Sequence, residues 1–71
     1  MKMTKEVVEA LKSQDETKLY HSLYDIYDKD SVKAVEAFNQ WKSQVKERDR
    51  NLIIRAEQRI YENEEAFNFM F

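Results

Sequence analysis

The chain has 71 residues, a net charge of −2 and a mean hydropathy of −0.85, and it contains no glycine, proline or cysteine. Without glycine, the tight turns of a multi-stranded sheet have no residue to form them, and without cysteine both disulfides and cysteine-based metal sites are excluded. The charged fraction of 37% beside 42% hydrophobic residues is typical of a helical protein and excludes a disordered chain.

The small size and the acidic balance restrict the partners further. A chain this short buries only about 60% of its unfolded surface, so we expect a homodimer or a bound protein to complete its core. The pI of about 5.4 argues against general affinity for nucleic acid.

No apolar run approaches the roughly 18 residues of a membrane span, and the first residues lack a signal-peptide core. We therefore expect a cytoplasmic protein without a membrane segment.

Two short helices are predicted first, over residues 4–12 and 14–27. Thr4 is the expected N-cap of the first helix, since its hydroxyl can accept a hydrogen bond from a free backbone amide. Ser13 and Glu16 match the spacing of a capping box, which would start the second helix.

The second helix carries two adjacent strips of side chains. Its aliphatic strip consists of Leu19, Leu23 and Ile26. Its aromatic strip, at spacing i, i+4 and i+7, consists of Tyr20, Tyr24 and Tyr27. Tyrosines often border a core with their hydroxyls in water, but tyrosine, tryptophan and arginine also dominate the energetics of protein interfaces. The aromatic strip is therefore a candidate partner surface.

A polar loop separates the second helix from the third. It offers Asp28, Asp30 or Ser31 as the next N-cap. A loop this short generally produces an antiparallel helix pair, so the second helix is expected to fold back along the third.

A long third helix is predicted over residues 31–68. Its apolar side chains fall on one face at about 100° per residue. They are Val35, Phe38, Trp41, Val45, Leu52, Ile53, Ala56, Ile60, Phe67, Met70 and Phe71. Residues 46–51 interrupt this stripe, and Asp49 lies in its middle. Two explanations are open. Either the helix breaks and Asp49 caps a new helix, or the helix continues and Asp49 is exposed or paired with an arginine of a partner chain. The unbroken apolar phase favours a continuous helix, with a possible bend near Asp49.

The sequence thus predicts a single all-α domain over residues 1–71, in which two short helices pack on the front half of a long one. The back half has too little chain left to cover it, and exposed apolar stripes mark interaction surfaces. We expect it to bind another protein or a second copy, giving a helical bundle by self-association. The expected anchors are Trp41, Leu52, Ile53, Ile60, Phe67 and Phe71.

Three arginines, Arg48, Arg55 and Arg59, fall on one flank of the stripe and are the expected rim charges. They are also a candidate strip for contacting phosphates, which would make the protein a nucleic-acid binder. The plainer alternative is a row of interhelical ion pairs, which long helices routinely carry.

The residues that enzymes require are scarce. His21 is the only histidine, and no glycine-rich loop or catalytic motif is present. The carboxylates occupy predicted solvated faces beside lysine or arginine. We therefore expect no catalysis, no metal and no cofactor.

These features predict a small binding protein that acts sterically, as an inhibitor, an adaptor or an assembly factor. A self-assembling scaffold protein is the main alternative, and a nucleic-acid binder is the other. The order of two short helices before a long charged one resembles small phage-encoded helical proteins, both inhibitors of host enzymes and prohead core components. The C-terminal residues 67–71 are expected either to pack inside the fold or to dock into a partner's groove.

Overall fold

The computed structural model describes residues 1–69, and it describes side chains as far as Glu64. Four helices account for most of these residues: α1 (Lys5–Ser13), α2 (Glu16–Lys29), α3 (Ser31–Gln44) and α4 (Glu47–Phe69). No described residue lies in a strand, so the all-α prediction is confirmed. None of the described helices combines the length and the apolar composition that crossing a membrane requires.

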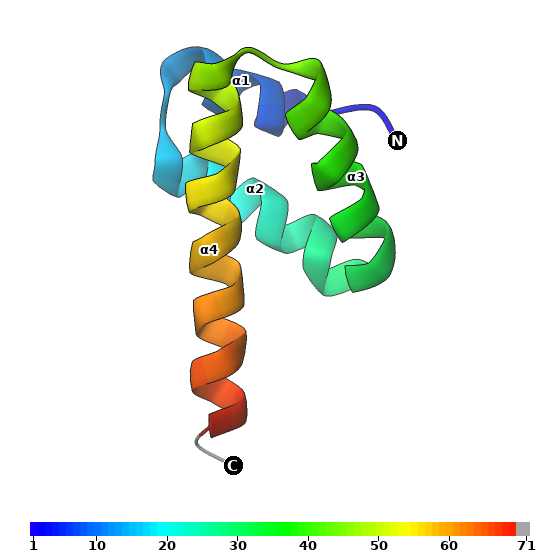
Figure 1. The fold of residues 1–71 in the computed structure, drawn as a ribbon, viewed down its shortest axis with the longest axis vertical. Helices are drawn as coiled ribbons and strands as arrows, with labels where there is room; N and C mark the ends of the chain where they lie inside the picture. Colours follow the sequence, from blue (N-terminus) through cyan, green and yellow to red (C-terminus); the bar gives the residue numbers. More distant parts are fainter. Residues whose placement is uncertain (70–71) are drawn as a thin grey trace.

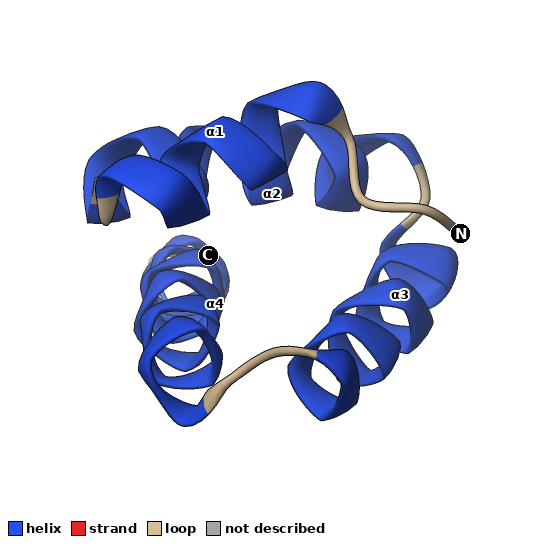
Figure 2. Cartoon of the chain, turned by 90° about the horizontal axis from the view of Figure 1, so that it is seen from above, coloured by secondary structure: helices blue, strands red, loops and turns tan. Residues whose placement is uncertain are grey.

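The helices form two layers (Figures 1 and 2). In one layer α1 and α2 run in opposite directions as a hairpin, and in the other α4 runs back beside α3. The hairpin lies across the second layer, and α2 packs against each of the other three helices. This arrangement differs from the expected hairpin on the front half of one long helix, because α2 contacts both α3 and α4.

The expected continuous helix over residues 31–68 is wrong, because the chain turns after Gln44. Val45 adopts an extended backbone, with φ −105° and ψ 165°, and α4 begins at Glu47. Arg50 stabilises this turn, since its Nε donates to the carbonyl oxygen of Lys42 at 2.9 Å and its Nη2 to that of Val45 at 3.3 Å. These carbonyls belong to the end of α3, where intrahelical partners run out.

Asp49 is in the first turn of α4 and does not cap it. A carboxylate is favourable there because the helix dipole is positive at its N-terminus. Its Oδ1 accepts hydrogen bonds from Gln14 Nε2 at 2.8 Å and from Arg48 Nε at 3.4 Å. The break therefore lies upstream of Asp49, and the carboxylate is paired within the chain, with no partner protein needed.

The turn closes a single core. Thirteen buried hydrophobic side chains form it: Val7, Ala10, Leu11, Leu19, Leu23, Ala34, Ala37, Phe38, Trp41, Leu52, Ile53, Ala56 and Ile60. The four that α4 supplies are at most 1% exposed. For the described side chains the expectation of an uncovered back half is therefore wrong, because folding α4 back along α3 buries Leu52, Ile53, Ala56 and Ile60 within a single chain.

The helix starts were predicted in part. Thr4 caps α1 as expected, with its hydroxyl accepting from the Val7 amide at 3.3 Å. The capping box is wrong, because α1 continues through Ser13, and α2 is capped instead by Asp15, whose carboxylate accepts from the Lys18 amide at 3.0 Å.

Asp30 alone connects α2 to α3. Its amide donates to the carbonyl oxygen of Ile26 at the end of α2, and its carboxylate accepts from the Lys33 amide at the start of α3. Asp30 was one of the three expected caps. However, α2 and α3 meet at a corner and lie in different layers, instead of forming the expected antiparallel pair (Figure 2).

Two neighbouring isoleucines on α4 test the core. Ile53 is 0% exposed and Ile54 is 37% exposed. We expect Ile53→Ala to lower the free energy of unfolding by about 2–5 kcal/mol, because it leaves a cavity. Ile54→Ala is the matched control and should cost less than about 1 kcal/mol. Urea denaturation measures both, and equal losses would contradict the buried stripe.

Gln14 connects the end of α1 to the start of α4, although its own backbone is in an unfavourable conformation. It has φ 54°, in the left-handed region, and its Nε2 donates both to the Leu11 carbonyl oxygen at 2.7 Å and to Asp49. Gln14→Ala and Gln14→Gly remove the same two hydrogen bonds, but only glycine adopts this φ freely. We expect the glycine variant to be more stable than the alanine variant by about 1 kcal/mol, as urea denaturation would show. The reverse order would rule out a left-handed backbone at this position.

Candidate interaction surface on helices α2 and α4

Most of the expected anchors lie where no partner can reach them. Trp41, Leu52, Ile53 and Ile60 are core residues. Trp41 is 1% exposed, and its indole Nε1 donates to the carbonyl oxygen of Met1 at 2.9 Å. These four residues therefore stabilise the fold. The other two expected anchors, Phe67 and Phe71, lie outside the described residues, Phe67 through its side chain and Phe71 entirely.

Two of the three flanking arginines connect α4 to the start of α2. Arg55 Nε lies 2.9 Å from a Glu16 carboxylate oxygen, and Arg59 Nη1 lies 3.7 Å from the other. Arg59 Nη1 also donates to the Thr17 hydroxyl at 3.4 Å. Arg48 is exposed and contacts the neighbouring Asp49. Arg55 and Arg59 thus form the interhelical ion pairs that were one interpretation of this flank.

The structure brings together the predicted aromatic strip and one further tyrosine. We call this set the tyrosine surface: Tyr20, Tyr24 and Tyr27 from α2, and Tyr61 from α4. All four are half-buried and pack against the core. The ring centroids of Tyr20 and Tyr24 are 5.8 Å apart, and Tyr27 and Tyr61 meet edge to face at 6.1 Å. Such separations are favourable for aromatic pairs, so the helices hold the rings as one surface.

One end of the tyrosine surface is fixed by α4. The guanidinium carbon of Arg59 lies 4.4 Å from the centre of the Tyr20 ring, within the range of a cation–π interaction. The side-chain amide of Asn63 donates to the Tyr20 hydroxyl. His21, which is exposed, meets the Tyr20 ring edge to face at 5.2 Å. The orientation of Tyr20 is therefore set from several sides.

The opposite end contacts an ion pair between α3 and α4, of which the carboxylate is buried and the lysine is partly exposed. The Tyr61 hydroxyl donates to Glu57 Oε2 at 2.9 Å, and Glu57 is only 5% exposed. Lys42 Nζ lies 2.7 Å from Glu57 Oε1 and forms an ion pair with it. Sequence reasoning missed this pair, because Glu57 was expected on a solvated face.

Two hollows adjoin Tyr27. The first, of about 360 Å³, has an apolar wall and is lined by Tyr27, Ser31, Val32, Val35 and Glu36. Val32 is 68% exposed, which is unusual for so large an apolar side chain in this molecule. The second hollow, of about 470 Å³, lies between the α2–α3 corner and α4, and its lining is acidic: Tyr27, Asp28, Lys29, Asp30, Ser31 and Glu64. Tyr27 thus lies between the tyrosine surface and both hollows, the apolar one and the acidic one.

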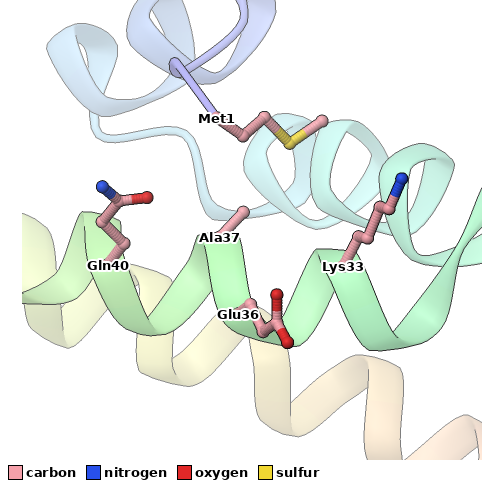
Figure 3. Close-up of a pocket in the computed structure, with 5 residues that line it drawn as sticks. All are labelled: Met1, Lys33, Glu36, Ala37 and Gln40. Carbon is pink, nitrogen blue, oxygen red and sulfur yellow. The ribbon is translucent and has the colours of Figure 1, made fainter.

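A further hollow, of about 310 Å³, lies beside α3 (Figure 3). Met1 reaches over the helix there, and Ala37 and Gln40 point towards it, with Lys33 and Glu36 at the rim. Ligand sites bring several polar groups together in an enclosed cavity. Here one methionine lies over a helix surface, so this hollow is a weaker candidate than the tyrosine surface.

No three histidine, aspartate or glutamate side chains among the described residues gather closely enough to hold a metal ion.

No family model, curated protein or solved structure matches this chain. The geometry of the surface is therefore the basis for the functional interpretation.

The buried position of Tyr61 predicts that the folded protein loses stability at alkaline pH. Its pKa is raised above the ordinary value of 10.0, first because burial disfavours the phenolate and then because its hydroxyl donates to Glu57. The unfolded chain loses this proton near its ordinary pKa while the folded chain keeps it. The stability contributed by Tyr61 is therefore complete below that pH and is lost as pH rises further, by about 1.4 kcal/mol per pH unit.

Tyr61→Phe removes this effect. We expect the stability of the wild type, relative to this variant, to fall as pH rises from about 9 to about 11 in urea denaturation. The comparison with the variant cancels the titration of the lysines. Parallel pH profiles for the two proteins would show that Tyr61 titrates as an ordinary exposed tyrosine.

Proposed function

We propose that this protein is a small non-catalytic binding protein that recognises another protein through the tyrosine surface. Its action would be steric, as an inhibitor, an adaptor or an assembly factor. The observation that carries the proposal is the gathering of four half-exposed tyrosines from two helices on one surface. Tyrosines and arginines are enriched among the residues that contribute most to protein interfaces.

The contacts that hold two of the tyrosines in place support this role. Binding costs free energy when side chains must be ordered at the interface. Tyr20 is already held by Arg59, and Tyr61 is already held by Glu57. A partner would therefore meet aromatic area that loses little further entropy. The apolar hollow beside Tyr27, with the exposed Val32, would extend the contact area onto α3.

Two alternatives remain to be distinguished by experiment. A self-assembling scaffold protein would use the same surface to bind a second copy. A nucleic-acid binder would use the arginine flank, but Arg55 and Arg59 are paired with Glu16 in the folded chain. The protein-binding role is favoured over nucleic-acid binding because these two arginines, although solvent-exposed, already share the Glu16 carboxylate as an ion-pair partner.

The test is capture from an extract of the cells in which the protein naturally acts. We expect the immobilised wild type to retain a specific protein and the double variant Tyr24→Ala/Tyr27→Ala to lose it, with affinity reduced at least about tenfold. The matched control is Lys18→Ala/Asp25→Ala, which truncates two exposed side chains of the same helix outside the tyrosine surface. Circular dichroism should show that both variants fold.

The other outcomes separate the alternatives. Retention by the tyrosine variant would overturn the proposed surface. A dimer in light scattering that only the tyrosine variant abolishes would favour self-assembly. Captured material that is nuclease-sensitive and elutes steeply with salt would favour nucleic-acid binding.

A further inference from the structure

The end of the tyrosine surface around Tyr27 is electrostatically one-sided. Three carboxylates, those of Asp28, Asp30 and Glu64, line the adjoining hollow of about 470 Å³ beside a single ammonium group, that of Lys29. Within the described part of the chain, none of these carboxylates has a cationic side chain at ion-pair distance. The hollow thus has Tyr27 at its edge and carries an excess of negative charge, although the Asp30 carboxylate also caps α3.

The other end of the same surface shows what this combination binds. There the Arg59 guanidinium lies over the Tyr20 ring and beside the Glu16 carboxylate. A tyrosine face and a carboxylate together hold one guanidinium inside the molecule. Among the described residues, Arg59 is the only cation placed over a tyrosine ring. Tyr27 and Glu64 both line the hollow, and among the described residues no cation of the chain lies over the Tyr27 ring.

The titration of Tyr24 is consistent with a negative potential at this end. Its pKa is raised from 10.0, first by partial burial and then by the nearby carboxylates of Glu64 and Asp28. These charges disfavour a phenolate at Tyr24 because like charges repel, and by the same physics they favour a cation. The aromatic faces add attraction for a guanidinium, which is planar and can stack while donating to carboxylates.

We propose that the hollow beside Tyr27 and Glu64 receives an arginine side chain from a basic segment of the partner protein. This inference rests on the proposed function and specifies the chemistry of the partner. A second copy is a poor source of that arginine. All four arginines of the chain already have a partner within it: Arg48 contacts Asp49, Arg50 binds the carbonyls at the end of α3, and Arg55 and Arg59 pair with Glu16.

The experiment uses a blocked tetra-arginine peptide and its tetra-citrulline counterpart, which has nearly the same shape without the charge. Each is titrated into the 71-residue protein while backbone amide shifts are recorded by NMR. We expect the arginine peptide to shift the amides of Tyr24, Tyr27, Asp28 and Glu64, and the citrulline peptide to leave them unchanged. Added salt should weaken the binding, since exposed charges are screened.

Three variants make the test specific. Glu64→Gln and Tyr27→Leu should each weaken peptide binding by at least about threefold, because the first removes a charge and the second removes an aromatic face. Glu47→Gln is the matched control, since it removes one exposed carboxylate from the opposite end of α4. It should leave the affinity unchanged.

Several results would overturn the inference. One is the absence of binding, and another is an equal loss for Glu64→Gln and Glu47→Gln, which would indicate general charge attraction. A third is a concentration-dependent shift of these amides without peptide, which would show a second copy in the hollow. In contrast, a captured partner that needs Tyr24 and Tyr27 but is indifferent to Glu64→Gln would retain the proposed function and exclude only the arginine contact.

Discussion

The two-residue turn between α3 and α4 is the feature on which the rest of the structure depends. A chain of this length without cysteine has only one core to hold it together, and that core needs side chains from all four helices. If residues 31–69 formed one helix, Phe38 and Ile60 would lie far apart along its axis. The turn at Val45 brings them into one cluster, and Arg50 binds the carbonyls that the turn leaves open.

The tyrosine surface results from the same closure. α4 can place Tyr61 against Tyr27 and Arg59 over Tyr20 only because it runs back across α2. The inner edges of these rings complete the core, and their outer parts stay in water. One set of side chains thus contributes to stability and also supplies exposed aromatic area. The described side chains of the α4 stripe are buried, so the tyrosines at the border of the core and the apolar hollow beside them are the aromatic and apolar area that this fold presents on helices α2 and α3.

Local signals predicted much of the fold. The all-α class, the Thr4 and Asp30 caps and the position of the tyrosines at the edge of the core could be read from spacing and residue type. The turn at Val45 could not, because no glycine or proline marks it and the apolar phase continues across it. Ser13 fits a capping box in sequence, but it is the last residue of α1 in the structure. The helix ends one residue later, because Gln14 adopts a left-handed conformation. The Lys42–Glu57 pair joins residues on separate helices, and no local pattern reveals such a contact.

The single-residue connection at Asp30 has a consequence for how this fold can vary. Most loops accept insertions and deletions, since they lie at the surface and carry few constraints. Here one residue both ends α2 and caps α3. One added residue that extended either helix would rotate α3 by about 100° relative to α2 and turn Phe38 and Trp41 out of the core. Divergent versions of this protein should therefore differ at this corner in residue type but not in length, with changes of length concentrated at the ends of the chain.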